Sequence, residues 1–196
     1  MSTLVIATKN KGKYSEFKKM LGLTTFDIVS LLDFPYIEIR ENGSSFDENA
    51  LIKAGVVAKR AGLPTLADDS GLEVQALKGE PGIFTARYAG QHATDEDNIN
   101  KLLKKLRDVP SDQRQARFVC SLALVFPNGK TFLEQGILEG FITFETRGTE
   151  GFGYDPVFYV PDLGRTLSEV SANEKNRISH RAKALTKIKK HLFLYM

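Results

Sequence analysis

The segment Thr65-Leu-Ala-Asp-Asp-Ser-Gly-Leu-Glu-Val-Gln-Ala76 sets two adjacent carboxylates between two apolar runs. Thr65–Ala67 and Leu72–Ala76 are typical of short buried strands, so we expect strands on both sides of Asp68-Asp-Ser-Gly71. Two neighbouring carboxylates at a strand end are hard to satisfy in a core. The alternative is a solvated turn held by an Asx hydrogen bond, and the flanking strands weigh against it.

The residues before this segment predict two strands and two helices. The predicted strands are Leu4–Ala7 and Phe26–Leu32, and the predicted helices run from about Tyr14 to Gly22 and from Ser45 to Gly62. The second helix begins with Ser45-Phe-Asp-Glu48, which has the spacing of a capping box. A strand, a lysine-rich loop and a helix therefore open the chain.

The residues after it predict a helix, a long hairpin and a final helix. Thr94-Asp-Glu-Asp97 caps the first helix, and Lys183–Leu194 has the apolar spacing of the last. Between them, Ala116–Phe126 and Thr131–Phe144 read as two strands joined by the turn Pro127-Asn-Gly-Lys130. The pattern predicts a mixed α/β fold with long antiparallel arms in its second half.

Length and composition indicate one globular domain over residues 1–196. Hydrophobic residues make up 42% and charged residues 26% of the chain, which argues against disorder. The net charge of +3 is too small to indicate a nucleic-acid binder. Cys120 is the only cysteine, so we expect a buried core residue rather than a disulfide or a catalytic thiol. Without a signal peptide or an apolar run of transmembrane length, we expect a cytoplasmic protein.

The loop after the first strand combines lysines, a glycine and the start of a helix. Its residues are Thr8, Lys9, Asn10, Lys11, Gly12 and Lys13. Such a loop can cradle an anion, because helix N-terminal amides and ammonium groups both favour negative charge. A solvated basic turn is an equally good interpretation of this segment alone, and the spacing of a Walker loop is missing.

The acidic pair has partners that suit phosphate chemistry. Asp68 or Asp69 could hold Mg²⁺, which prefers a few carboxylates together with phosphate oxygens and water, and one of them could act as a general base. Asn49 and Lys53 are four residues apart and share a helix face. Taken alone, Lys53 is better read as a surface lysine, and Glu41 alone indicates nothing.

Two later segments carry groups that can recognise a base. In Gly151-Phe-Gly-Tyr-Asp-Pro156 a glycine-flanked Phe152 can stack on a base, and Asp155 can accept a hydrogen bond from a ring N–H. The alternative is an aromatic turn that plugs the core. Lys175, His180 and Arg181 lie just before the predicted last helix. Their side chains can donate hydrogen bonds to a purine 6-oxo group. Adenine has an amino group at that position, so the same donors would stay unpaired.

Six stretches match one known family in its own order along the chain. They are Ala7–Lys13, Phe46–Ala50, Ala67–Leu72, Pro81–Gly90, Gly151–Pro156 and Ile178–Arg181. On these stretches the chain resembles the inosine triphosphate pyrophosphatase family in its bacterial form, the dITP/XTP pyrophosphatases. Lys9 stands where many members have glycine and Thr85 where serine is common, and both departures are mild.

The resemblance implies an α/β fold: an elongated mixed β-sheet with flanking helices that form two lobes around a central cleft. It implies Mg²⁺-dependent hydrolysis of ITP, dITP and XTP to the monophosphate and pyrophosphate, which cleanses the nucleotide pool. It also implies a homodimer. The small net charge and the apolar runs, which are all shorter than a transmembrane span, lead us to expect no nucleic-acid and no membrane partner.

The resemblance further implies roles for individual residues. Thr8–Lys13 and Lys53 hold the triphosphate, and Ser70 contacts substrate. Glu41 and Asp69 serve the metal, and Asp69 activates the attacking water. Glu38 is the alternative to Glu41 as a metal ligand, and Asp68 is an alternative metal ligand to Asp69 or shares its role. The residues implied to recognise the nucleoside are Phe152, Gly153, Tyr154, Asp155, Lys175, His180 and Arg181.

Two other functions remain in competition. A Maf-like pyrophosphatase for modified pyrimidine or methylated nucleotides shares a similar fold, although the donors of Ser179-His-Arg181 favour 6-oxopurines. A non-enzymatic nucleotide- or RNA-binding module would use the basic 183–190 stretch. That module has no need of Asp68 and Asp69.

Overall fold

The structure, a computed structural model, describes residues 2–34 and 36–196. Its strands are β1 (Thr3–Ile6), β2 (Asp27–Ser30), β3 (Thr65–Val74), β4 (Gln115–Val125), β5 (Thr131–Ile142), β6 (Phe158–Val160) and β7 (Arg165–Thr166). Its α-helices are α1 (Lys11–Leu21), α2 (Phe46–Ala61), α3 (Asp95–Lys105), α4 (Ala172–Ile178) and α5 (His180–Tyr195). Short 3₁₀ turns join several of them, among them η3 (Gly82–Arg87).

The strands form one mixed sheet in the order β2-β1-β3-β4-β5-β6-β7. β1 pairs in parallel with β2, Thr3 opposite Asp27, and with β3, Val5 opposite Thr65. β6 pairs antiparallel with β5 and with β7. The mixed α/β architecture expected from the sequence is therefore confirmed.

The chain divides into two compact units. The first contains the residues up to Asp69, Cys120–Gly136 and His180–Met196, and the second contains Ser70–Val119 and Ile137–Ser179. β3, β4 and β5 each contribute residues to both units. A single domain over 1–196 and a central cleft stay predictions beside this division.

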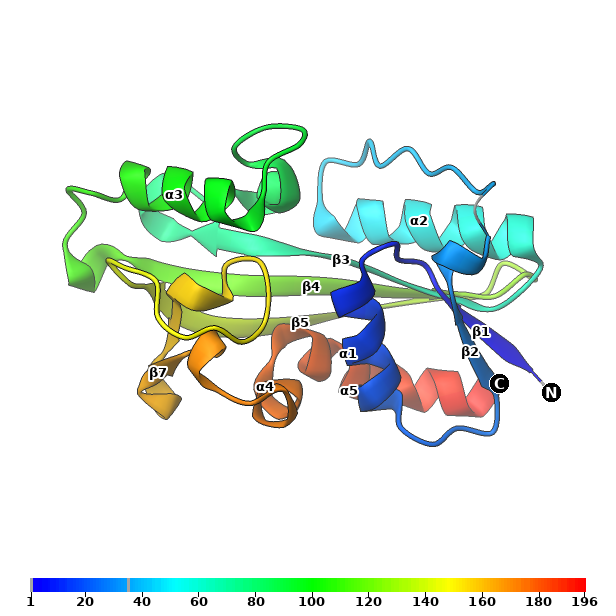
Figure 1. Cartoon of the computed structure of the whole chain (residues 1–196). Helices are drawn as coiled ribbons and strands as arrows, with labels where there is room; N and C mark the ends of the chain where they lie inside the picture. The colour runs from blue at the N-terminus through cyan, green and yellow to red at the C-terminus, as the bar shows by residue number, and fades with distance from the viewer. Residues whose placement is uncertain (1, 35) are drawn as a thin grey trace. The chain divides into compact units, whose positions relative to one another are not determined.

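In the first unit, helices cover both faces of the sheet (Figure 1). On one face the apolar side of α2 packs Ala50, Ala54 and Val57 into a core cluster with Ala67 of β3. On the other face α1 and α5 form a separate cluster with Leu66. Successive residues of β3 therefore face different helices, as the alternation of a strand requires.

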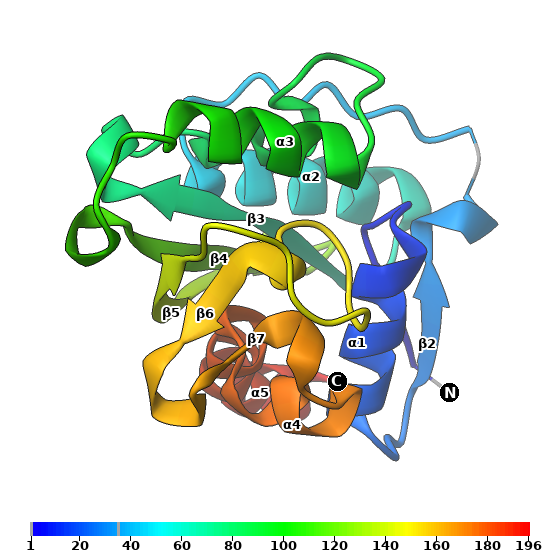
Figure 2. The ribbon, with the colours of Figure 1, turned by 60° about the vertical axis from the view of Figure 1, so that its left-hand side comes forward.

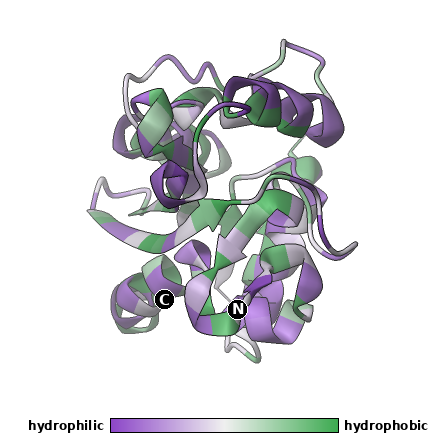
Figure 3. Cartoon of the chain, turned by 90° about the vertical axis from the view of Figure 1, so that its left-hand side faces the viewer, coloured by the Kyte–Doolittle hydropathy of each residue, from purple (hydrophilic) through white to green (hydrophobic). Residues whose placement is uncertain are grey.

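The second unit has a core of its own. α3, at the top of Figure 2, places Ile99 and Leu102 in one cluster with Leu106, the residue directly after the helix, and with residues of β3, β4, β5 and β6. The helices carry polar turns on their outer sides, while apolar stretches lie along the strands (Figure 3). Within residues 2–34 and 36–196, every helix is too short or too polar to cross a bilayer.

The capping signals place most helix ends where the sequence predicts them. Ser45 is the N-cap of α2 and accepts the Glu48 N–H, while Gly62 ends that helix in the left-handed conformation. Thr94 and Asp97 form the capping box of α3. The Glu48 carboxylate accepts the Ser44 N–H at 2.7 Å, whereas in a capping box it would accept the N–H of the N-cap, Ser45.

Two expected strand boundaries are wrong. Asp68-Asp-Ser-Gly71 does not separate two short strands but lies inside the continuous strand β3. Its polar side chains stay in a strand because charged partners surround them, as described below. β2 is shorter than predicted and ends at Ser30, because Ser30 and Asp33 form a capping box that starts a 3₁₀ turn.

The last helical segment also differs from the prediction. α5 begins at His180, so His180 and Arg181 are its first residues rather than the residues before it. Lys175 lies on a separate helix, α4, which was not expected. Ser179 separates the two helices in an extended conformation, and apolar spacing alone gave no sign of this break.

Candidate active site

The predicted site residues fall into one group in each unit. The first-unit group comprises Thr8, Lys9, Asn10, Lys11, Gly12, Lys13, Glu41, Lys53, Asp69, His180 and Arg181. The second-unit group comprises Ser70, Phe152, Gly153, Tyr154, Asp155 and Lys175. Each group is described within its own unit.

Asp68 and Asp69 lie on opposite faces of β3. Leu66 belongs to the cluster of α1 and α5, and Ala67 to the cluster of α2. Side chains alternate along a strand, so Asp68 faces α1 and α5 while Asp69 faces α2. The two acids are adjacent in sequence and have separate surroundings.

Asp68 is a buried carboxylate neutralised by two cations. Its side chain is 1% exposed, and it lies 2.7 Å from Nζ of Lys13 and 3.3 Å from Nε of Arg181. The Cys120 thiol donates to it at 3.7 Å. Burial opposes ionisation, but the charges of Lys13, Arg181 and Lys53 hold the pKa of Asp68 well below its usual range. Asp68 is thus a fixed negative charge that ties α1 and α5 to the sheet.

Cys120 is buried, as the sequence predicts. Burial and the nearby Asp68 carboxylate raise the pKa of its thiol well above the ordinary value. A thiol that stays protonated is a poor nucleophile, so Cys120 serves the core and hydrogen-bonds Asp68.

Arg181 and His180 start α5 next to this buried charge. The Arg181 guanidinium also contacts Glu16 of α1, 3.1 Å away, and both Arg181 and His180 are buried. A cation at a helix N-terminus is ordinarily unfavourable, and here the two carboxylates compensate it. Their predicted contact with the nucleoside stays a prediction.

Asp69 and Glu41 converge on the ammonium of Lys53. Lys53 Nζ lies 2.9 Å from Glu41 and 3.5 Å from Asp69, and it donates to the Asp68 carbonyl at 3.1 Å. The Asp69 side chain is only 14% exposed. We call Glu41, Lys53 and Asp69 the acidic cluster.

One face of α2 positions this cluster. Asn49 is buried, and its Oδ1 accepts the Gly43 N–H at 2.9 Å, which fixes the loop that carries Glu41. Lys53 follows four residues later on the same face. A Cβ at Gly43 would lie 2.7 Å from Asn49 Oδ1, so this close approach requires glycine. Lys53 is therefore not the surface lysine that its sequence context alone favours.

The charges within the acidic cluster shift two pKa values. Burial raises the pKa of Asp69 above its ordinary value, and the attraction of Lys53 and Lys13 does not cancel that effect. Burial lowers the pKa of Lys53, but the Asp69 and Glu41 charges outweigh it and the net shift is upward. Asp69 is a better proton acceptor than an ordinary surface aspartate.

The lysine loop is ordered by its own side chains. Thr8 Oγ1 accepts the Asn10 N–H at 3.1 Å, and Asn10 caps α1 by accepting the Lys13 N–H at 3.0 Å. Lys9 and Lys11 are exposed beside the helix N-terminus, which suits an anion. Lys13 differs from them because its ammonium is paired with Asp68.

The acidic cluster offers carboxylates, a type of ligand that Mg²⁺ uses in proteins. Its two carboxylates already converge on one cation, Lys53. Among the described residues, no group of three or more histidine, cysteine, aspartate or glutamate side chains is arranged to hold a metal. Mg²⁺ tolerates such a sparse set, since it takes one or two carboxylates and fills its other positions with phosphate oxygens and water.

In the second unit, the segment Gly151–Asp155, which we call the nucleoside loop, is tied to Lys175. Asp155 Oδ2 accepts the Phe152 N–H at 2.9 Å and contacts Lys175 Nζ at 2.6 Å. That ammonium lies 4.5 Å from the centroid of the Phe152 ring. Asp155 and Lys175 are both buried, so Asp155 is less open to a base than the sequence suggested.

The two aromatic residues of the nucleoside loop have different surroundings. Tyr154 is buried in the core of the second unit, and its hydroxyl donates to the Thr85 carbonyl at 3.0 Å. The interpretation of a core-plugging aromatic therefore holds for Tyr154. Phe152 is only half-buried, and the Lys175 ammonium lies against its ring.

Comparison with known proteins fixes the family. The model of the Ham1 family matches residues 4–191. The chain belongs to the Ham1 family.

Close relatives and solved structures of the Ham1 family cover almost all of the chain. A dITP/XTP pyrophosphatase from Halalkalibacterium halodurans is 52% identical over 98% of this chain and 100% of its own length. One from Geobacter sulfurreducens is 50% identical over 98% and 97%. The Ham1 protein of Staphylococcus aureus has a TM-score of 0.89 at 40% identity, covering 100% of both chains, and that of Coxiella burnetii 0.90 at 43%, covering 99% and 100%.

In the nucleoside loop, position 151 requires glycine. A Cβ there would lie 2.1 Å from Asp155 Oδ2, and its φ is +83°. We expect Gly151→Ala to lower the free energy of unfolding by about 3 kcal/mol, measured by urea denaturation. Gly153→Ala is the control: φ is +63° but nothing lies within 4 Å, so about 1 kcal/mol is expected. Equal losses would contradict the contact with Asp155.

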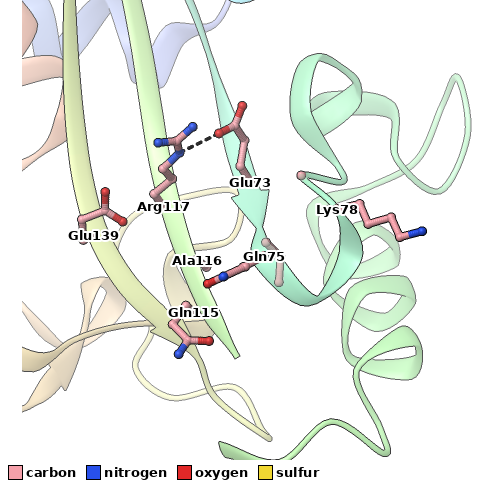
Figure 4. A pocket seen from close by; sticks show the side chains of 9 residues that line it. Glu73, Gln75, Lys78, Gln115, Ala116, Arg117 and Glu139 are labelled. Carbon is pink, nitrogen blue, oxygen red and sulfur yellow. Dashed lines mark hydrogen bonds and ion pairs between the residues drawn. The ribbon is translucent and has the colours of Figure 1, made fainter. Parts of the chain in front are cut away.

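The second unit of the protein also contains a cavity of about 390 Å³. It is lined by polar and apolar residues of β3, β4, β5 and the turn after β3, and none of them is a predicted site residue. Figure 4 shows Glu73 and Arg117 turned toward each other there, at 2.7 Å.

Sequence reasoning missed several groups that hold the Ham1-family site together. Glu16 lies one helical turn after Lys13 on α1, so helix spacing could have indicated it. Thr85 accepts the Leu72 N–H and Asp95 accepts the Gly153 N–H. These two contacts are long-range, and no local pattern indicates them.

Proposed function

We propose that this chain is a nucleoside triphosphate pyrophosphatase that hydrolyses ITP, dITP and XTP to the monophosphate and pyrophosphate. The observation that carries the proposal is the acidic cluster, in which Glu41 of a loop and Asp69 of β3 are held around Lys53 of α2. The name of the relatives, dITP/XTP pyrophosphatase, supports the substrate class.

We propose Glu41 and Asp69 as the residues that would hold Mg²⁺. The ion supplies positive charge to phosphate oxygens and lowers the pKa of bound water. Lys53 keeps the two carboxylates in place, and the exposed Lys9 and Lys11 attract the triphosphate to the start of α1. Lys13 acts indirectly, because its ammonium and the Arg181 guanidinium together neutralise the buried Asp68 carboxylate.

We also propose Asp69 as the acceptor of the proton of the attacking water. Its burial raises its pKa, which brings it nearer to the range of a general base. Attack on the α-phosphorus releases pyrophosphate, whose growing charge Lys53 stabilises.

Recognition of the base is assigned to the nucleoside loop and Lys175. Phe152 stacks on the base, and Lys175 donates toward a 6-oxo group. Adenine carries an amino group there and leaves such donors unpaired, which costs affinity. Ser70, Tyr154, His180 and Arg181 stay predicted substrate contacts.

We also propose a cytoplasmic homodimer. The resemblance to the bacterial pyrophosphatases supports both properties. Light scattering coupled to size-exclusion chromatography measures the mass directly, and a mass of one chain would contradict the dimer.

A pyrophosphate-release assay tests the function. With Mg²⁺, we expect ITP, dITP and XTP to give kcat/KM values about 100-fold or more above those of ATP. Removal of Mg²⁺ with EDTA should abolish release. A preference for ATP would contradict the assigned base recognition. Faster turnover of dUTP or dTTP would favour a Maf-like enzyme, and nucleotide binding without hydrolysis would favour a binding module.

A further inference from the structure

Two consecutive backbone N–H groups of the nucleoside loop are held by two different carboxylates. The Phe152 N–H donates to Asp155, inside the loop, and the Gly153 N–H donates to Asp95 Oδ2 at 2.7 Å. Asp95 lies in α3, 58 residues before Gly153. Asp95 therefore forms a direct contact between α3 and the loop.

Asp95 stands on a rigid support. It is the first residue of α3, directly after the N-cap Thr94, whose capping box with Asp97 fixes the helix start. Ile99 and Leu102 anchor the same helix in the core of the second unit. The carboxylate of Asp95 is thus presented from a backbone that has little freedom to move.

A second tie links the nucleoside loop to α3 through η3. Tyr154 donates to the Thr85 carbonyl. Asn98 of α3 is buried, and it accepts the Ala89 N–H at 2.8 Å and donates to the Ala86 carbonyl at 3.4 Å. Both ties therefore end on the first turns of α3.

The loop needs such support because glycines surround its aromatic residue. Gly151 and Gly153, on either side of Phe152, have φ values of +83° and +63°, and glycine restricts the backbone least of all residues. The bond from Asp95 fixes the backbone immediately after Phe152. Without it, the ring can turn away from the ammonium of Lys175.

We infer that Asp95 is a positioning residue for base selection: by binding the Gly153 N–H, it holds Phe152 where the base stacks. This inference rests on the proposed function, because it takes the nucleoside loop as the base-recognition element. Asp95 acts through the loop and has no part in the chemistry of the acidic cluster.

Steady-state kinetics of Asp95→Ala against Glu96→Ala test the inference. Glu96 is the matched control, because it is an exposed acid in the same first turn. We expect Asp95→Ala to raise KM for ITP roughly tenfold and to reduce the ITP-over-ATP ratio of kcat/KM, with kcat within about twofold of the wild type. Glu96→Ala should match the wild type in KM and in that ratio.

Affinity for IMP, measured by titration calorimetry, gives a readout that does not depend on turnover. We expect Asp95→Ala to weaken it roughly tenfold and Asp95→Asn, which keeps an acceptor oxygen, to weaken it by about threefold. If Asp95→Ala matched Glu96→Ala in KM, selectivity and IMP affinity, the inference would be overturned. An inactive wild type would instead refute the proposed function, so the two failures are distinguishable.

Discussion

Asp69→Asn is expected to lower kcat for ITP by about 10³-fold while the protein stays folded. The change removes the negative charge from one of the two carboxylates proposed to hold Mg²⁺. It also removes the proposed proton acceptor. Lys53 keeps its closer contact with Glu41, at 2.9 Å, so the free energy of unfolding should change by less than about 1 kcal/mol.

Glu73→Gln is the matched control for this variant. Glu73 is a carboxylate on the same strand, β3, and is also ion-paired, with Arg117 at 2.7 Å. It should keep wild-type turnover. Near-normal turnover of Asp69→Asn with Mg²⁺ present would show that Asp69 is neither a metal ligand nor the base.

Asp68→Asn, in contrast to Asp69→Asn, is expected to lower the free energy of unfolding, by about 3 kcal/mol. Removing the charge leaves the Lys13 and Arg181 cations next to a neutral amide in a buried position. Breaking a buried ion pair from one side costs more than the pair contributes, because the remaining charge stays desolvated. Glu16 still compensates Arg181 in part, which keeps the loss from being larger.

Urea unfolding of the Asp68→Asn and Asp69→Asn proteins measures this difference. The two substitutions are chemically identical and one residue apart, so each is the control of the other. We expect a clear fall in the midpoint for Asp68→Asn and little change for Asp69→Asn. Equal midpoints would contradict the assignment of Asp68 to a buried ion-pair network.

The sequence predicts the helices well where short-range signals act. Ser45 and Gly62 bound α2 as expected, because capping is a local interaction between residues three or four apart. The hairpin around Asn128-Gly129 is likewise determined by its own turn, in which the Gly129 N–H donates to the Phe126 carbonyl at 2.9 Å.

Long-range contacts explain what the sequence could not predict. The polar run of β3 looks like a turn because its counter-ions are distant in sequence; Arg181 is 113 residues from Asp68. Strand alternation, once β3 is known to be continuous, separates the two acids onto different faces. The break between α4 and α5 also has no signal in the apolar spacing, since Ser179 fits a helical surface as well as a cap.

The same limit applies to the candidate site. Lys53 is an ordinary helical lysine by its spacing, and only the fold shows it buried between Glu41 and Asp69. The family resemblance supplied both partners, whereas the residues alone gave no reason to select Glu41. Neither the residue pattern nor the family resemblance indicated Asp95, because its partner is a backbone N–H that is distant in sequence.

Hydrolysis of ITP in ¹⁸O-labelled water, followed by mass spectrometry of both products, tests the central claim most directly. Attack of water on the α-phosphorus places the label in IMP and leaves the pyrophosphate unlabelled. We expect one labelled oxygen in IMP for each turnover with Mg²⁺. Label in the pyrophosphate, or release of inorganic phosphate with IDP, would contradict the account.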